Sequence, residues 1–361
     1  MRDDAQKSSG SLTFFSCGRG DTILVCSGCE TWGLIDCNLT VSSNTRRRLE
    51  EAITANRVKE LQFVCLTHPH KDHFHGMPKL LEECFGARAF HEGGGKFKEF
   101  WDTGVLGTVW PLMLRGRETG LAAEVEDLIK LVMPLVHDDQ IDYRILNGDR
   151  AARVGFGEFY IHCLAPRMNR IERFRHHTVD EIRKSSEKDF VVMKEEVNNL
   201  SAVLAFVHKK THATILLSSD ATIDTWEEAL QVWHDLTNKK RRFDAVEVSH
   251  HGAKPNLYSD LYADWCVPDT TVAILSVGPK DPNHPHEDVL RMLRKCRIEP
   301  YFTCRRESDV QTQIRSDLLI GDSQKSQSKS SRFPVEPDYV FADLEVIIQE
   351  DGPLKVVEHR S

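Results

Sequence analysis

The segment Thr67–His73, THPHKDH, constrains this chain more than any other. Three histidines and a carboxylate lie within six residues, directly after the apolar run LQFVCL and before a helix-like stretch. Zinc and similar ions bind imidazole nitrogen and carboxylate oxygen at roughly 2.0–2.2 Å when several such groups converge. Residues two apart in an extended chain face the same way, so His68 and His70 are predicted to serve one ion. Asp72 and His73, at the turn into the helix, are predicted to face a second.

Composition narrows the class of protein. Apolar residues make up 40 % of the 361 positions and charged residues 28 %, as in globular proteins. No window approaches the roughly 18 consecutive apolar residues of a membrane helix, and the first residues lack the apolar core of a secretory signal. The ten cysteines are scattered, mostly within apolar runs, which favours reduced, buried thiols. We therefore expect a cytoplasmic protein without membrane contact.

The order of elements predicts an α/β layer structure. Strand-like runs over residues 11–37 precede a helix opened by Ser43 or Asn44, and an apolar strand leads into the histidine segment. Strands and amphipathic helices alternate again after residue 200. We interpret residues 11–361 as one domain, ending in a hairpin that turns at Asp351-Gly352.

Three segments are interpreted as insertions into this domain. Residues 93–143 are predicted to form a helical insertion, because apolar residues recur at helical spacing from Leu121 to Leu135. Residues 167–196 form a basic insertion, for which a solvated helix or mobile loop and a substrate-steering lid both stay open. Residues 310–338, rich in Ser, Lys and Gln, are predicted to be a flexible loop.

The HxHxDH spacing resembles the signature of the metallo-β-lactamase superfamily. Four further segments, FFSCGRGDTILV, SSDAT, SHHGAK and SVGPKDPNHPH, are similar to the hydrolase domain of ComEC-type DNA-uptake proteins and their stand-alone relatives. The match spans roughly residues 12–304 and the terminal hairpin, and it lacks the membrane channel of the uptake proteins. This resemblance implies an αββα sandwich with a mono- or dinuclear metal site along one sheet edge.

The resemblance also implies roles for individual residues. Asp36 is expected to orient the metal-binding loop, and Asp220 to bridge two metals. One of His250 and His251 is expected to be the last metal histidine, and which of them ligates stays open. The superfamily's third histidine has no clear match here; His162 lies nearby in sequence, but strand alternation points it toward the core. The first metal site is then expected to have two histidines and the bridging aspartate, with Asn199 as a neighbour.

We expect two divalent ions, Zn²⁺ or Mn²⁺, to lower the pKa of a bridging water and to stabilise charge on a phosphoryl or acyl oxygen. Asp72, Asp220 and His284 are the candidate catalytic residues, with His284 contacting a scissile phosphate or protonating the leaving group. The leading hypothesis is a DNase-like phosphodiesterase. The net charge of −8 argues against nucleic-acid binding over the whole surface but not against a local basic groove. The residues expected to neutralise backbone phosphates are Arg167, Arg170, Arg173 and Arg175.

Two alternatives stay open. The first is a hydrolase of a small phosphodiester, a lactone or a thioester, which the acidic net charge favours. The second is a metal-stabilised regulatory module without turnover, acting with a partner protein of a multi-component system. The oligomeric state is not determined by the sequence.

Overall fold

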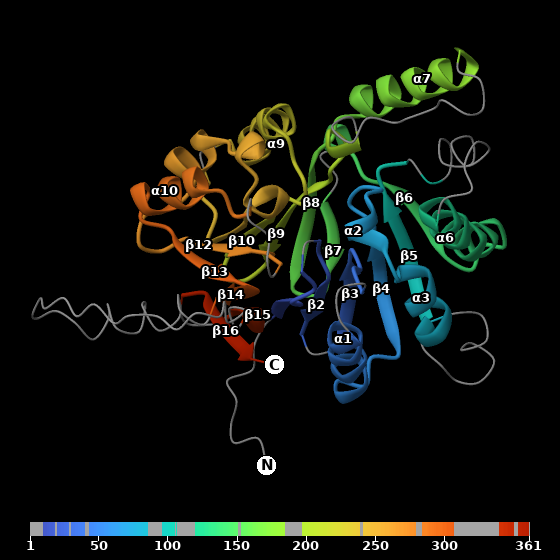
Figure 1. Cartoon of the computed structure of the whole chain (residues 1–361), viewed down its shortest axis with the longest axis horizontal. Coiled ribbons are helices and arrows are strands. Elements are labelled where there is room, and N and C mark those ends of the chain that lie inside the picture. Colours follow the sequence, from blue (N-terminus) through green and yellow to red (C-terminus); the bar gives the residue numbers. More distant parts are fainter. Residues whose placement is uncertain are drawn as a thin grey trace, which may run out of the picture.

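A computed structural model describes most of the chain (Figure 1). The described residues are 10–18, 20–28, 30–39, 43–85, 96–104, 106, 120–150, 153–184, 197–238, 241–278, 284–306, 339–349 and 353–360.

The first of two mixed sheets has the order β14-β15-β1-β2-β3-β4-β5-β6, with β16 paired to β15. Strands β3 to β6 run parallel, whereas β15, β1, β2 and β3 pair antiparallel. The bounds are β1 (Gly10–Phe14), β2 (Ile23–Ser27), β3 (Thr31–Ile35), β4 (Glu60–Cys65), β5 (Lys96–Asp102), β6 (Asp142–Ile145), β14 (Cys304–Arg306), β15 (Tyr339–Ile348) and β16 (Lys355–Arg360).

The second sheet has the order β13-β12-β11-β10-β9-β8-β7. Strands β10 to β13 run parallel, and β7 to β10 pair antiparallel. The bounds are β7 (Arg153–Phe156), β8 (Phe159–Ala165), β9 (Val203–His208), β10 (Thr214–Leu217), β11 (Ala245–Glu247), β12 (Val272–Leu275) and β13 (Glu299–Phe302).

The two sheets pack face to face over an apolar core. In this core the ring of Phe63 stacks on Trp101 with centroids 4.0 Å apart, and the edge of Phe156 meets Phe63 at 5.0 Å. Helices α1 (Ser43–Ala55), α3 (Met77–Phe85) and α6 (Gly120–His137) share a buried cluster with the first sheet. Helices α9 (Ile223–Thr237) and α10 (Glu287–Lys295) do the same for the second. These four layers confirm the predicted αββα sandwich.

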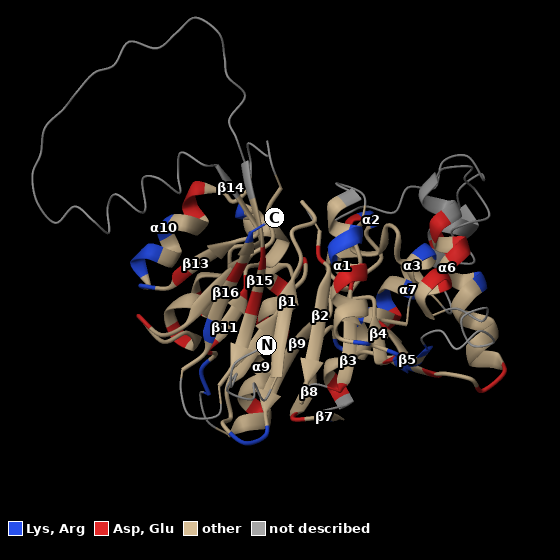
Figure 2. Ribbon diagram, turned by 90° about the horizontal axis from the view of Figure 1, so that it is seen from below, with Lys and Arg blue, Asp and Glu red and all other residues tan. Residues whose placement is uncertain are grey.

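Charge follows the layers. Figure 2 shows that the strands are mostly uncharged and that Lys, Arg, Asp and Glu gather on the outer helices. Helix α9 is an example of this separation, because Trp226 and Trp233 on one of its faces are buried. The helix begins after Thr222, whose hydroxyl accepts a hydrogen bond from the Thr225 N–H. Within the described segments, no helix is both long and apolar enough to cross a membrane.

The helical prediction for residues 93–143 is wrong at its N-terminal end. Residues 96–102 form β5, a parallel strand between β4 and β6, and α6 is the long helix among the described residues of this stretch. The sequence KFKEFWD has few apolar residues, yet Phe97 and Phe100 contribute to the helix-side core cluster and Trp101 to the core between the sheets. Side chains on both faces of β5 are therefore buried, as in a central parallel strand. The sequence prediction missed this strand because it extended the helical spacing of residues 121–135 back to residue 93.

The other predicted insertions are only partly described. Residues 168–184 of the basic segment form helix α7 (Met168–Lys184), which extends beyond the two sheets in Figure 1. Residues 185–196, the predicted loop 310–338 and the turn at residues 351–352 lie outside the described residues. Strands β15 and β16 pair antiparallel, as the predicted terminal hairpin requires.

Candidate metal centre

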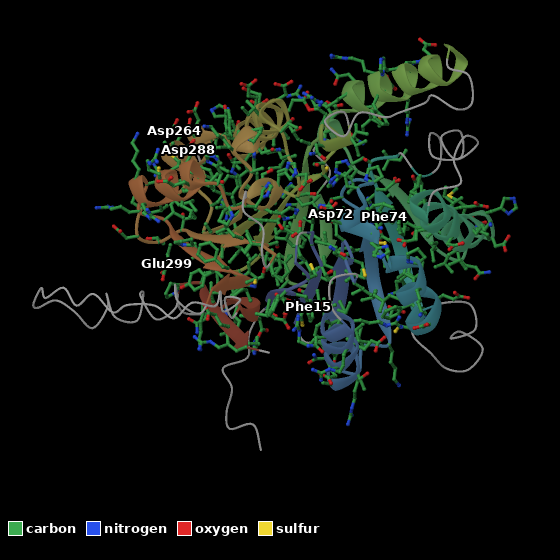
Figure 3. The ribbon with its side chains drawn as sticks, in the orientation of Figure 1. Phe15, Asp72, Phe74, Asp264, Asp288 and Glu299 are labelled. Atoms are coloured by element: carbon green, nitrogen blue, oxygen red, sulfur yellow. The ribbon has the colours of Figure 1, made fainter. Side chains whose placement is uncertain are left out.

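The histidine segment lies where β4 ends. His68 and His70 follow the strand, and the short helix α2 (Lys71–Phe74) carries Asp72 and His73. Figure 3 shows Asp72 beside Phe74 on this helix. A backbone bond of 2.8 Å from the Cys37 N–H to the His73 carbonyl ties α2 to the end of β3. Because β3 and β4 run parallel, this segment lies at the carboxyl ends of these two strands of the first sheet.

Asp220 lies at the centre of the histidines. It follows β10, so it reaches the segment from the second sheet, and only 1 % of it is exposed. Its Oδ2 lies 3.5 Å from Nε2 of His68 and 3.8 Å from Nδ1 of His70. Its Oδ1 lies 3.5 Å from Nε2 of His73. The two carboxylate oxygens thus face two different groups of histidines.

The tandem histidines divide between the same two oxygens. His250 and His251 both have left-handed backbone conformations, with φ of 50° and 55°, and their rings are inclined by 81°. Nε2 of His250 lies 3.6 Å from Oδ2 of Asp220. Nε2 of His251 lies 3.8 Å from Oδ1 of Asp220 and 3.8 Å from Oδ2 of Asp72. The structure therefore brings both histidines to the cluster, where the sequence suggested only one.

Neighbouring polar groups fix these rings. Oδ2 of Asp36 lies 2.6 Å from both Nδ1 of His73 and the Thr67 hydroxyl. Nδ2 of Asn256 donates to the carbonyls of Asp220 and Ala221, which leaves its Oδ1 as an acceptor 3.0 Å from Nδ1 of His250. These contacts assign a proton to Nδ1 of His73 and of His250, so that Nε2 of each ring is the atom directed toward Asp220.

Ionisation follows from burial and neighbouring charge. Burial opposes the charged form of Asp220, but the histidines, His73 foremost, hold its pKa well below the usual value. Burial is the main cause that lowers the pKa of His68 to about 3. Burial also opposes protonation of His73, yet the carboxylates of Asp36 and Asp220 raise its pKa well above the usual value. The centre therefore combines an anionic Asp220, a protonated His73 and a neutral His68.

The donor set suits divalent cations. Nε2 of His68, His70 and His73 and Oδ1 of Asp220 are buried without a hydrogen-bond partner. Such an orphaned polar atom costs about 1–3 kcal/mol unless a ligand meets it. The atoms of His68, His70 and Asp220 lie within 4.8 Å of one another, as do those of a second group, Asp72, His73 and His251. Imidazole nitrogens and carboxylate oxygens at such spacing fit divalent cations.

Other predicted residues take different places. The His284 ring stacks on His250, with centroids 6.0 Å apart, so it adjoins the cluster. Asn199 does not, because its amide oxygen accepts from the Thr222 hydroxyl at the start of α9. Its neighbour Asn198 lies nearer, with Nδ2 3.5 Å from Nδ1 of His250. His162 is half-buried against Trp233 of α9 rather than in the core between the sheets.

Two of the four predicted phosphate-binding arginines are engaged within the protein. Nη2 of Arg170 lies 2.8 Å from Oε1 of Glu228 on α9. Nη2 of Arg175 donates to the Gly104 carbonyl at 2.7 Å. The backbone N–H of Arg167 donates to Oε2 of Glu228, whereas Arg173 is exposed.

Two buried carboxylates near the centre were missed by sequence reasoning. Oδ2 of Asp21 lies 3.8 Å from Nδ1 of His73. Oε2 of Glu247 accepts from the N–H groups of Ser218 and Ser219, just before Asp220. Asp21 lies in the GRGD segment that carries the family resemblance, which was a usable signal. Glu247 is a lone carboxylate in the buried strand AVEVS, and one sequence cannot distinguish it from a surface residue.

Comparisons with known proteins give remote likenesses. No protein-family model and no curated protein sequence matches the chain. A mutant of the CmlA β-hydroxylase is 10 % identical with a TM-score of 0.37, over 81 % of this chain and 52 % of that one, so this chain spans about half its length. A diphosphatase of the PhnP family is 11 % identical with a TM-score of 0.35, over 81 % of this chain and 85 % of that one. Unliganded yeast PDE1 is 11 % identical with a TM-score of 0.44, over 82 % of this chain and 97 % of that one.

Proposed function

We propose that this chain is a metal-dependent phosphodiesterase with a dinuclear centre. The observation that carries the proposal is that each oxygen of Asp220 faces its own group of imidazoles, several with buried, unpartnered Nε2 atoms. Asp220 would bridge the ions. The remaining proposed ligands are His68, His70 and His250 for one ion and Asp72, His73 and His251 for the other.

Two bound ions supply a water of lowered pKa and neutralise charge on a phosphoryl oxygen. The chain's own residues prepare the site for this chemistry. Asp36 and Asn256 hold the rings of His73 and His250 with Nε2 toward Asp220. The His284 ring stacks beside that of His250, and His284 is our candidate to protonate the leaving oxygen.

Nucleic acid is the first substrate to test, because the sequence resembles DNA-uptake hydrolase domains. A small phosphodiester is the second candidate, and two observations favour it. Arg170 and Arg175 are engaged by Glu228 and the Gly104 carbonyl, and the net charge is −8. The ion pair of Arg170 and the acidic net charge reduce the positive charge available to a nucleic-acid backbone, and the hydrogen bond of Arg175 occupies part of its guanidinium.

The test uses the full chain loaded with Zn²⁺ or Mn²⁺. The metal-to-protein ratio is measured together with turnover of bis-p-nitrophenyl phosphate, single- and double-stranded DNA, RNA, a cyclic nucleotide and a lactone. We expect about two ions per chain and hydrolysis of a phosphodiester. Asp220→Ala should abolish both, whereas Asp260→Ala, an exposed carboxylate, should change neither. Metal binding without turnover of any substrate would instead support the regulatory module.

A further inference from the structure

The loop between β1 and β2 lies against the candidate metal centre. A backbone bond of 2.9 Å from the Phe15 N–H to the Thr22 carbonyl closes its base. Gly20 packs onto helix α2 so closely that a Cβ would lie 2.0 Å from the Asp72 carbonyl oxygen. With φ of 102°, this position favours glycine on conformational grounds as well. Position 20 therefore has no room for a side chain, and its backbone packs directly against the residues of the centre.

The backbone N–H of Gly20 is directed into the centre. It donates to Nε2 of His251 over 3.2 Å. That same nitrogen lies 3.8 Å from carboxylate oxygens of Asp72 and Asp220, which makes it one of the proposed ligand atoms. An sp² imidazole nitrogen has one lone pair, so it cannot accept this hydrogen bond and ligate a cation together.

We propose that the Gly20 N–H is a substrate-binding donor, which contacts a phosphoryl oxygen once His251 Nε2 is engaged by a cation. This inference rests on the proposed function and adds a residue to it. A backbone N–H aimed at the place where negative charge gathers is the kind of donor that stabilises an oxyanion. Because it is part of the main chain, its direction is set by the loop and not by a rotamer.

Hydrogen bonds anchor the described residues of this loop on both sides of its turn. Oδ1 of the buried Asp343 on β15 accepts from the Ser16 N–H at 2.8 Å, and its Oδ2 pairs with Arg48 at 2.9 Å. The Thr45 hydroxyl donates to the Ser16 carbonyl, and the thiol of Cys17 donates to the Gly20 carbonyl. A donor fixed before substrate arrives pays no reorganisation cost when charge develops.

The amide resonance of Gly20 tests the proposal directly. The sequence contains two Arg-Gly pairs, Arg19-Gly20 and Arg115-Gly116, so carbonyl-labelled arginine with ¹⁵N-glycine selects two amide signals in the full chain. A Gly116→Ala variant identifies which signal belongs to Gly20. Zn²⁺, which is diamagnetic, is added first, and inorganic phosphate is then titrated while the histidine ring resonances are followed in parallel.

We expect Zn²⁺ to shift the Gly20 amide upfield, as its acceptor is lost, and phosphate to shift it downfield by several tenths of a p.p.m. with saturation. If the histidine resonances respond to Zn²⁺ and phosphate but the Gly20 amide does not, this inference is overturned and the proposed function survives. If the histidine resonances ignore Zn²⁺, the proposed metal centre itself fails.

Discussion

Oδ2 of Asp36 lies 2.6 Å from Nδ1 of His73, and both side chains are buried. The same carboxylate accepts from the N–H and the hydroxyl of Thr67, the residue before His68. One side chain of the β3 end therefore orients a ring on α2 and the start of the histidine segment. In metal sites such a carboxylate behind a histidine fixes the ring and strengthens it as a ligand.

The first prediction follows from this contact. Asp36→Asn should weaken metal binding by roughly 10–100-fold, because the amide removes the charge that stabilises the Nδ1–H tautomer of His73. Competition with a chromogenic chelator measures the affinity, and circular dichroism checks that the variant folds. Asp260→Asn is the matched control on the surface. Unchanged affinity in a folded Asp36→Asn protein would show that His73 needs no such partner.

The second prediction separates the tandem histidines. Because His250 and His251 face different oxygens of Asp220, His250→Ala and His251→Ala should each remove about one of two ions, from different positions. Metal analysis gives the stoichiometry, and Co²⁺ spectra distinguish the remaining site in each variant. If one variant lost both ions and the other lost none, only one of His250 and His251 would be a metal ligand.

The sequence predicted the fold and most of the side chains that gather around Asp220, but not how the histidines divide between its two oxygens. The strand-end segment and the ordered aspartates suffice to place a centre at a sheet edge, because strand ends converge there in any α/β layer structure. The division between His250 and His251 depends on two consecutive left-handed residues, which no spacing rule reports. Asn199 was chosen over Asn198 for the same reason: in an irregular segment, adjacent residues face different ways and periodicity gives no guide.

Strand β5 and Glu247 show a second limit. KFKEFWD becomes a strand because it is inserted between β4 and β6, so tertiary pairing decides its conformation. Glu247 is buried because the N–H groups of Ser218 and Ser219 are available to its carboxylate, and those belong to a neighbouring strand end. Both depend on partners distant in sequence.

The third prediction concerns pH and Glu247. Burial, with the nearby Asp21 carboxylate, raises the pKa of Glu247 from its usual 4.5 to about 8. Its folded form therefore holds a proton that the unfolded chain releases, and this stabilisation is complete below pH 4.5 and is lost as pH rises through about 8. Glu247→Gln, which mimics the protonated acid, should lack this dependence.

Urea unfolding of wild type and Glu247→Gln from pH 5 to pH 9 measures the effect. The variant should gain stability relative to wild type as pH rises, by on the order of a few kcal/mol in total. Differences between the two proteins at each pH cancel the histidines, which titrate in both. Glu227→Gln, on the exposed face of α9, should give a flat difference. A flat profile for Glu247→Gln as well would mean that Glu247 is ionised in the folded protein.

The fourth prediction distinguishes structure from substrate contact on α7. Arg170 and Glu228 are each about one-fifth exposed and form an ion pair that links α7 to α9, so Arg170→Ala should cost roughly 0.5–1 kcal/mol of stability. It should leave the salt dependence of DNA cleavage unchanged, because Glu228 already neutralises the charge of Arg170.

Arg173 is exposed on the same helix. If α7 contacts a nucleic-acid backbone, Arg173→Ala should reduce the slope of log(kcat/KM) against log[salt] by about 1, through one released counterion fewer. Equal slopes in wild type and Arg173→Ala would show that Arg173 on α7 does not contact a nucleic-acid backbone, and would favour a small phosphodiester as the substrate. The two non-bridging oxygens of such a substrate would need only the metal centre and the Gly20 N–H.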